Sequence, residues 1–349
     1  MPDARPLRCA VIGAGRMGMV HGHLLQVYPG TELVGFVDPQ RGAHERLASQ
    51  GLRAPVFTGI PEVLASANPE AVFICTPTHT HLAVTRECLA RPLHLFMEKP
   101  VATSVADADA ILALAREHRV MHAAGYVYAH LPIVDEARRL LAEGVLGEVL
   151  RFSAHAYISE VFGPKSGWFF QRELSGGGVV ANMGSHVLFI LGWMFGRIRR
   201  VMATTRSNAS NVEDSAHALL WFDGGVTGML DTSWSMPGAQ MLDYGITIDG
   251  RQGTLVLGRE QILLHLLRPI GDHPEGWSEI HASDLPADTA FDISPHIGGE
   301  SFYRQLRAFE TACRTGQLPF CSLDEAANTQ RMIEGIYTSA ASGQPVEIG

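Results

Sequence analysis

The 349-residue chain lacks several features that would place it in other classes of protein. Its five cysteines are odd in number and include no CxxC pair, a pattern typical of reduced thiols in a cytosolic protein. The formal net charge is −9 and no basic run is present, so we do not expect it to bind nucleic acid. The first residues do not resemble a secretion signal, and no apolar stretch reaches the roughly 18 residues that span a bilayer. We therefore expect a cytoplasmic protein with no membrane partner.

The composition is that of a globular protein. Hydrophobic residues make up 46% of the chain and charged residues 18%, which leaves ample material for buried cores. A chain of this length is typical of two domains, or of one domain with a large appendage.

Short apolar runs alternate with helical patterns in the first third of the chain. Predicted strands cover residues 7–12, 33–37, 56–57, 71–75, 93–97 and 120–124, and the runs 7–12 and 71–75 are apolar enough to indicate buried strands. Helical segments separate them, and one of these begins at Ser104, a good N-cap residue. This alternation predicts an α/β domain with a doubly wound parallel sheet, a Rossmann domain over residues 1–125.

The pattern changes after residue 126. A helix is predicted from Pro132 to Glu143, and β-rich sequence follows from Glu148. Two pairs of apolar runs flank the turns 223–225 and 250–253, which indicates hairpins and an antiparallel sheet. Two helical stretches close the chain. We expect residues 126–349 to form a second, α+β domain, and the last helices could pack back on the first domain.

A glycine-rich loop follows the first predicted strand and has the spacing GxGxxG. Its residues are Gly13, Ala14, Gly15, Arg16, Met17 and Gly18. A helix begins within the loop, and Asp38 ends the next strand about twenty residues later, as in dinucleotide-binding domains. The helix N-terminus would bind the pyrophosphate, and Asp38 would accept hydrogen bonds from the adenosine ribose. Asp38 favours NAD, although the nearby Arg41 keeps NADP open as an alternative.

Three further segments carry chemically informative residues. Thr76 to His81 follow the strand 71–75, and Glu98-Lys99-Pro100 follow the strand 93–97. The third segment, residues 175–186, has the sequence SGGGVVANMGSH. Ligands of open α/β sheets bind beyond the carboxyl ends of the strands, so we expect the first two segments to lie beside the cofactor.

Taken together, these motifs resemble the glucose–fructose oxidoreductase / inositol dehydrogenase (Gfo/Idh/MocA) family over essentially the whole chain. The combination of GxGxxG, EKP and GGG-x3-[DN]-x3-H is far more specific than any one of the three motifs. The resemblance implies a second domain with a large, open, mostly antiparallel sheet that often serves in oligomerisation. It also implies pyridine-nucleotide-dependent redox chemistry at a secondary alcohol, commonly on a sugar or cyclitol.

The same resemblance suggests three catalytic residues. Lys99 corresponds to the family's catalytic lysine, and an ammonium there would hold the developing alkoxide or polarise a carbonyl. His186 corresponds to the acid/base that exchanges the hydroxyl proton. Asn182 stands where aspartate is most common, and an amide can orient a hydroxyl but cannot relay a proton in the same way. Its i,i+4 spacing from His186 predicts that both side chains share a helical face.

The resemblance also extends the cofactor site beyond the glycine loop. It places the 76–81 loop against the nicotinamide ribose, and we include Thr76, Pro77, His79, His81, Glu98 and Lys99 among the cofactor-binding residues. The pairs His21/His23 and His79/His81 have no cysteine or carboxylate ligands near them in sequence, so no metal site is expected.

Candidate substrate contacts come from segments expected to face the same cleft: Tyr126, His155, Tyr157, Trp168 and Arg172. These side chains could stack on or hydrogen-bond to a hydroxylated ring, and each could equally be a packing residue.

The leading hypothesis is an NAD(P)-dependent sugar or cyclitol dehydrogenase or ketoreductase. One alternative is an NAD-dependent glycosidase of the same family that oxidises C3 transiently and then eliminates. Another is a non-catalytic nucleotide-binding regulator, which would be expected to lose Lys99 and His186. The apolar strands between Ala216 and Leu257 would leave an exposed sheet face, so we expect a homodimer or homotetramer.

Overall fold

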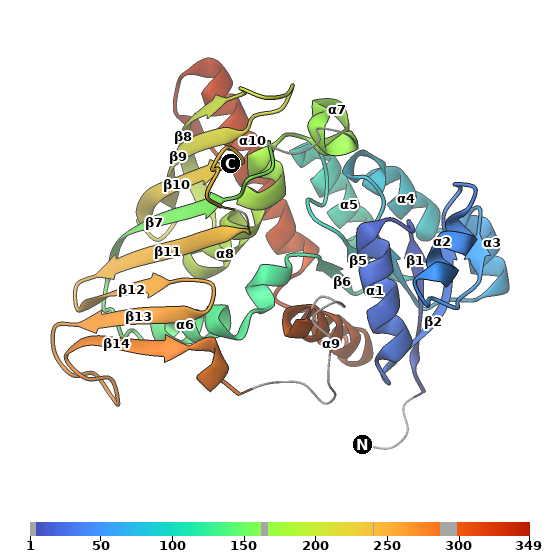
Figure 1. Ribbon diagram of the computed structural model, residues 1–349, viewed down its shortest axis with the longest axis horizontal. Coiled ribbons are helices and arrows are strands. Elements are labelled where there is room, and N and C mark those ends of the chain that lie inside the picture. Colours follow the sequence, from blue (N-terminus) through green and yellow to red (C-terminus); the bar gives the residue numbers. More distant parts are fainter. Residues whose placement is uncertain (1–4, 162–166, 240, 287–298) are drawn as a thin grey trace. The chain divides into compact units, whose positions relative to one another are not determined.

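The computed structural model describes residues 5–161, 167–239, 241–286 and 299–349 (Figure 1). The chain divides into two compact units. The first combines Met1–Tyr126 with Thr289–Ala327, and the second combines Val127–Asp288 with Asn328–Gly349. Each unit has its own sheet, and each is described separately below.

The first unit contains a six-stranded sheet in which every neighbouring pair is parallel. The strand order is β3-β2-β1-β4-β5-β6, so the order reverses between β1 and β4 as in a Rossmann fold. The strands are β1 (Leu7–Ile12), β2 (Thr31–Val37), β3 (Val56–Phe57), β4 (Ala71–Ile74), β5 (His94–Met97) and β6 (His122–Ala124). The predicted doubly wound parallel sheet is confirmed.

Helices connect these strands and cover the sheet. They are α1 (Arg16–Val27), α2 (Ala43–Ser49), α3 (Ile60–Ser66), α4 (His81–Cys88) and α5 (Val105–Glu117), with a 3₁₀ turn η1 (Thr78–Thr80) before α4. Ser104 caps α5 by accepting a hydrogen bond from the N–H of Asp107, as its position in the sequence predicts. Helix α9 (Gly299–Thr315) also belongs to this unit, where Phe309 packs edge-on against the stacked rings of Phe73 and Phe96.

The second unit contains a nine-stranded sheet of order β14-β13-β12-β11-β7-β10-β9-β8-β15. Its strands are β7 (Val149–Tyr157), β8 (Ile198–Arg206), β9 (Ser215–Phe222), β10 (Thr227–Ser233), β11 (Asp243–Gly250), β12 (Gly253–Leu257), β13 (Gln261–Leu266), β14 (Gly276–His281) and β15 (Val346–Glu347). All neighbouring pairs are antiparallel except β7 and β10, which are parallel. The expected large, mostly antiparallel sheet is therefore confirmed.

Helices of the second unit lie on one face of this sheet (Figure 1). The helical elements of this half of the chain are η2 (Val127–His130), α6 (Pro132–Ala142), η3 (Trp168–Phe170), α7 (Arg172–Ser175), η4 (Val180–Gly184), α8 (Ser185–Phe195), η5 (Ala282–Asp284) and α10 (Leu323–Ser342). Helix α10 begins in the first unit and continues into the second. The buried side chain of Phe152 on β7 stacks on Phe195 of α8, which identifies the inner face of the sheet.

The opposite, outer face of the sheet carries exposed apolar side chains in one row. Met202, Leu219 and Met229 are paired in register on β8, β9 and β10, and each is at least 40% exposed. Burial along β9 alternates residue by residue, so this row faces away from the inner face that Phe152 occupies.

Among the residues that the structure describes, one helical run is long and apolar enough to cross a membrane by length and composition alone. It extends from Arg172 to Phe195, whereas we expected from the sequence that no apolar stretch would reach the roughly 18 residues that span a bilayer. However, 72% of its most apolar window is buried inside the protein, as in the core helix of a globular domain.

Candidate active site

The glycine loop begins where β1 ends, and its shape requires two of its glycines. Gly13 has a φ of +98°, a left-handed conformation that L side chains rarely adopt, and a Cβ there would lie 2.8 Å from the Cys75 carbonyl oxygen. A Cβ on Gly18 would lie 1.9 Å from the carbonyl oxygen of Gly13. Gly15 has no heavy atom within 4 Å of its Cβ position, which leaves open space at the start of α1. Arg16 is exposed and Met17 half-buried beside that space.

Asp38 lies at the carboxyl end of β2 and is fixed by the glycine loop. Its Oδ2 accepts a hydrogen bond of 2.9 Å from the N–H of Ala14, and its Oδ1 accepts one of 2.9 Å from the N–H of Gln40. The arginine that contacts it is Arg46 of α2, whose Nη2 lies 3.5 Å from Oδ2. Arg41, which the sequence suggested as the neighbouring cation, is exposed. The acid beside the loop is thus present with a positive charge next to it.

The loop after β4 is held in place by its histidine and threonines. The two ring nitrogens of His81 lie 2.9 Å from the Thr76 carbonyl oxygen and 3.1 Å from that of Val101. Burial lowers the pKa of His81, and the two carbonyl oxygens oppose that shift. Thr80 donates a hydrogen bond of 2.7 Å to the Thr76 hydroxyl. His81 is therefore a structural anchor of this loop.

The remaining two residues of that loop differ in exposure. Pro77 immediately precedes the 3₁₀ turn η1 and is half-buried, while His79 within the turn is exposed. Both lie beyond the carboxyl end of β4, the edge of the sheet at which the sequence placed the cofactor.

Lys99 follows β5 and is the second residue beyond its carboxyl end. Burial lowers its pKa to about 8, and the neighbouring Glu98 carboxylate acts in the opposite direction. Glu98 accepts a hydrogen bond from the backbone N–H of Lys99 at 3.2 Å, and its other oxygen lies 2.7 Å from Nε2 of His21. The peptide bond between Lys99 and Pro100 is cis. A lysine in this state can hold or release a proton near neutral pH.

Tyr126 ends the first unit just beyond β6. The side chain is 1% exposed, and burial raises the pKa of its hydroxyl far above the ordinary value. The N–H of the preceding Gly125 donates to the Met97 carbonyl oxygen, so Tyr126 is anchored to the end of β5.

The triple glycine of the second unit packs against a buried carboxylate. The N–H of Gly178 points between the two oxygens of Glu213, at 2.9 and 2.8 Å, and the N–H of Val180 donates to the same group at 3.0 Å. The hydroxyl of Tyr337 on α10 donates to it at 2.8 Å. Burial raises the pKa of Glu213, and these hydrogen bonds oppose that shift. Sequence analysis missed Glu213 and Tyr337 because only the fold brings them to the glycines.

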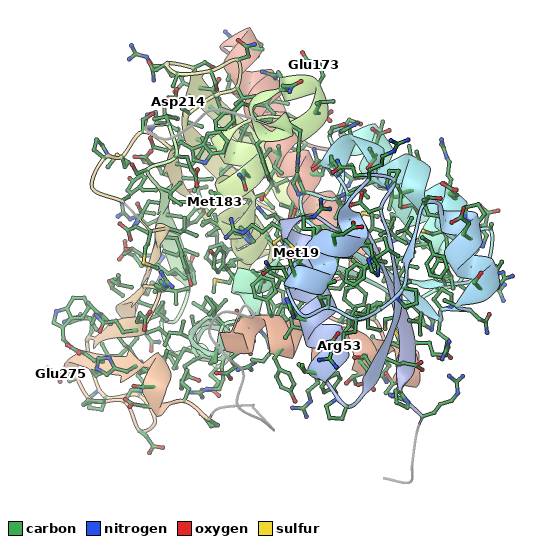
Figure 2. All side chains as sticks on the ribbon, turned by 45° about the vertical axis from the view of Figure 1, so that its right-hand side comes forward. Met19, Arg53, Glu173, Met183, Asp214 and Glu275 are labelled. Atoms are coloured by element: carbon green, nitrogen blue, oxygen red, sulfur yellow. The ribbon has the colours of Figure 1, made fainter. Side chains whose placement is uncertain are left out.

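Asn182 and His186 lie directly after this anchored turn. Residues Val180–Gly184, including Met183 labelled in Figure 2, form a turn of π-helix, and α8 continues from Ser185. A π-helical turn is rare and occurs often at functional sites. The i,i+4 spacing still places both side chains on nearly the same side, because four residues make close to one turn of either helix. Asn182 is half-buried and His186 is 5% exposed.

A tyrosine that the sequence did not single out contacts His186, and a second tyrosine contacts the first. The ring of Tyr128 meets the imidazole edge-on at 4.4 Å, and Tyr244 of β11 lies 5.6 Å from Tyr128. Tyr244 is 3% exposed, and its hydroxyl has no hydrogen-bond partner among the described residues. Polar aromatic groups thus lie beside the predicted acid/base.

The other substrate candidates occupy different places. His155 and Tyr157 of β7 stack on each other at 4.8 Å and alternate with the buried Ala154 and Ala156. They therefore lie on the outer face of the sheet, and the structure does not bring them together with His186. Figure 1 shows α8 on the other side of this sheet.

Trp168 and Arg172 precede the triple glycine. Trp168 stacks on Phe169 at 4.0 Å, and the exposed Arg172 lies 5.0 Å above the ring of Tyr337, the partner of Glu213. Arg172 is therefore connected to the glycine turn through an aromatic contact.

Among the residues that the structure describes, no group of three or more His, Cys, Asp or Glu side chains could hold a metal ion.

The fold and these residues define a nicotinamide-dinucleotide oxidoreductase with a separate α+β domain. Residues 7–126 match the model of the oxidoreductase family with an NAD-binding Rossmann fold (GFO_IDH_MocA), and residues 134–256 match the GFO/IDH/MocA C-terminal domain. The chain belongs to the Gfo/Idh/MocA oxidoreductase family, and its first unit is an NAD-binding Rossmann domain.

Several proteins of known description are similar to this chain. The D-glucoside 3-dehydrogenase of Escherichia coli is 28% identical, with 98% of both chains covered. The scyllo-inositol 2-dehydrogenase (NAD(+)) of Bacillus subtilis is 25% identical and covers 98% of this chain and 96% of its own. Among solved structures, GenD2 from gentamicin A biosynthesis in complex with NAD has a TM-score of 0.82 and 28% identity, covering 99% of this chain and 97% of its own.

Proposed function

We propose that the protein transfers a hydride between NAD and a secondary alcohol or ketone carbon of a sugar, a cyclitol or a sugar-derived compound. The observation that carries the proposal is Lys99, a half-buried lysine whose pKa is lowered to about 8, at the carboxyl end of β5 in the NAD-binding unit. Ligands of such sheets bind at this edge. The relatives that act on glucosides and inositol support the substrate class.

In this proposal Lys99 acts as an ammonium. When bound, NAD supplies or accepts the hydride. A positive charge next to the reacting oxygen stabilises the alkoxide that develops during oxidation, or polarises the carbonyl during reduction. Because burial brings its pKa to about 8, Lys99 is mostly protonated at neutral pH.

His186 exchanges the hydroxyl proton, and Asn182 orients the hydroxyl that reacts. The imidazole of His186 is buried against Tyr128 and belongs to the helix that follows the anchored glycine turn, so its orientation is fixed. The Asn182 amide can both donate and accept a hydrogen bond. Tyr126, Tyr128, Trp168 and Arg172 are the side chains we assign to contacts with the rest of the substrate.

NAD is the preferred cofactor. The Asp38 carboxylate at the end of β2 would accept hydrogen bonds from the ribose hydroxyls and repel a 2′-phosphate. Arg46, 3.5 Å from it, would reduce that repulsion, so NADP would still bind, though less well.

We further propose that two copies of the chain associate through the outer face of the nine-stranded sheet. The row formed by Met202, Leu219 and Met229 is apolar and exposed, and such patches are typical of interfaces. The stacked pair of His155 and Tyr157 lies on this same face.

A panel of polyols, aldoses and glycosides with NAD and NADP tests the activity, with absorbance of the reduced nicotinamide as the readout. We expect NAD reduction with at least one member of the panel. The variants K99A and H186A should abolish turnover while NAD binding stays largely intact, and H265Q on strand β13, which is not among the predicted site residues, serves as a control. Near-full activity of either variant would contradict the assignment. Turnover of a glycoside without release of free NADH would instead indicate the transient-oxidation glycosidase.

A further inference from the structure

A buried histidine connects the helix of the glycine loop to the loop that carries Lys99. His21 lies in α1, and its Nε2 is 2.7 Å from Oε1 of Glu98. The two residues are 2% and 7% exposed. The imidazole is enclosed by the rings of Phe73, Phe96 and Phe302, whose centroids lie 5.4, 4.8 and 5.9 Å from its own. Because a carboxylate only accepts hydrogen bonds, His21 is the donor.

The Glu98 carboxylate is held on three sides. His21 donates to Oε1, and the backbone N–H of Lys99 donates to Oε2 at 3.2 Å. Gly125 closes the third side, since a Cβ there would lie 3.0 Å from both carboxylate oxygens. The carboxylate therefore has one defined position next to Lys99.

The position of the Glu98 carboxylate matters because its negative charge acts on the protonation of Lys99. Burial favours the neutral amine and lowers the Lys99 pKa to about 8, while the Glu98 charge favours the ammonium. A buried carboxylate that loses its hydrogen-bond donor binds a proton more readily, and its charge is then lost. The effect of Glu98 on Lys99 thus depends on the donor at position 21.

We propose that His21 is a positioning residue that holds the Glu98 carboxylate in place and thereby keeps Lys99 protonated at neutral pH. The link to turnover rests on the function proposed above. The effect on Lys99 itself does not, because it can be measured without any substrate. The competing explanation is that His21 only attaches α1 to the end of β5.

The lysine content of the chain allows a direct measurement. Lys99 and Lys165 are the only two lysines in the sequence, and Lys165 lies outside the described residues. Protein with the K165R substitution, labelled with ¹³C at Cε of lysine, gives one lysine signal whose chemical shift reports the Lys99 pKa. In that background we expect H21L and E98Q each to lower this pKa by about one unit. H21Q, which retains an N–H donor of similar reach, should leave it near the wild-type value.

Two further variants keep the test decisive. H21N is too short to reach Glu98 and replaces H21L if the apolar variant does not fold. H94Q is the matched control, because His94 lies at the opposite end of β5 and its Nδ1 accepts a hydrogen bond from the N–H of Met121. An unchanged Lys99 pKa in E98Q, or a lowered pKa in H21Q equal to that in H21L, would overturn the inference.

Measurements of activity against pH then distinguish a failure of this inference from a failure of the proposed function. If the Lys99 signal shifts as expected and the alkaline limb of the pH–rate profile shifts with it, both are supported. If the signal shifts but turnover keeps its pH profile, the role of His21 stands and the catalytic role of Lys99 is wrong. NADH binding, measured by fluorescence, should stay within about twofold of wild type in H21Q and H21L, because neither change alters the glycine loop.

Discussion

The backbone N–H of Gly178 points between the two carboxylate oxygens of Glu213, 35 residues further along the chain. A Cβ at position 178 would lie 2.0 Å from the carbonyl oxygen of Glu213, so only glycine allows this approach. The contact fixes the turn from which the helix bearing Asn182 and His186 begins. Glu213 therefore supports the predicted catalytic residues without belonging to their motif.

The first prediction concerns the hydrogen bond between Tyr337 and Glu213. We expect Y337F to lower the free energy of unfolding by about 1 kcal/mol, because the buried carboxylate loses one donor. E213Q should lower the free energy of unfolding more than Y337F does, because the new amide group would face the N–H of Gly178. The double variant should be less destabilised than the sum of the two single variants, as measured by urea unfolding. Additive effects would show that the two side chains act independently.

A second prediction concerns the pH dependence of turnover. If the Lys99 ammonium is the active form, its contribution to the rate is constant below its pKa of about 8 and falls as the pH rises through that value. K99R stays charged at all accessible pH values, so its residual activity should lose this alkaline limb. The pH profile of kcat/KM on an identified substrate measures both. A rate that rises through pH 8 would instead make Lys99 a general base.

The third prediction concerns the choice of cofactor at Asp38. D38S removes the charge that would repel a 2′-phosphate, so the KM for NADP should fall, while the KM for NAD should rise about tenfold with the loss of hydrogen bonds to the ribose. In the D38S background, R46A should weaken NADP use again, because Arg46 is the cation beside this position. The exposed Arg41 provides the control, and R41A should have a smaller effect than R46A.

Two glycines of the cofactor loop should respond differently to the same substitution. G18A places a Cβ 1.9 Å from the Gly13 carbonyl oxygen, so the loop must distort, and both the melting temperature and NAD binding should decrease. G15A adds its Cβ to open space, so the melting temperature without NAD should be nearly unchanged. NAD binding should still weaken, because that space is where we expect the pyrophosphate to approach the backbone. Thermal unfolding with and without NAD separates the two effects.

The fifth prediction concerns the outer sheet face. L219E places a charge in the middle of the apolar row between Met202 and Met229. We expect the wild-type chain to have a light-scattering mass that is a multiple of 37.9 kDa, and the variant to have the monomer mass. Leu318 is similarly exposed, at 47%, but belongs to the first unit, so L318E is the control and should not dissociate the oligomer. A wild-type mass of 37.9 kDa would contradict the proposal.

Local sequence was sufficient to predict most of the parallel sheet. Strands such as Ala71–Ile74 are continuous apolar runs that end at glycines or polar loops, and both their type and position follow from burial on two faces. The apolar run before the turn 250–253 is only the centre of β11, Asp243–Gly250, because pairing with β7 extends the strand beyond that run. Strand ends in an antiparallel sheet depend on the partner strand, which the local pattern does not contain.

The site was predictable only where a spaced motif marks it. The glycine loop was predicted from its spacing and its flanking strand and helix, and Lys99 and His186 were predicted from motifs that resemble those of the family. Glu213 and His21 were not, because each acts through a partner dozens of residues away and neither sits in a recognisable spacing. For His155 and Tyr157 the sequence was not sufficient. Alternation along β7 shows that the two side chains share one face of the sheet, but it does not show which face.

The parallel pairing of β7 with β10 has a consequence for how the second unit assembles. These neighbouring central strands are separated in sequence by the whole segment from Ile158 to Val226, which includes Asn182 and His186. Pairing them closes a loop of about 70 residues. The entropy lost in that closure is offset only when the contacts of the surrounding sheet have formed. The segment that carries Asn182 and His186 thus lies between two paired strands of the same sheet, so it should unfold with the sheet as one cooperative unit. Amide hydrogens of α8 should then exchange through the same global opening as those of β7.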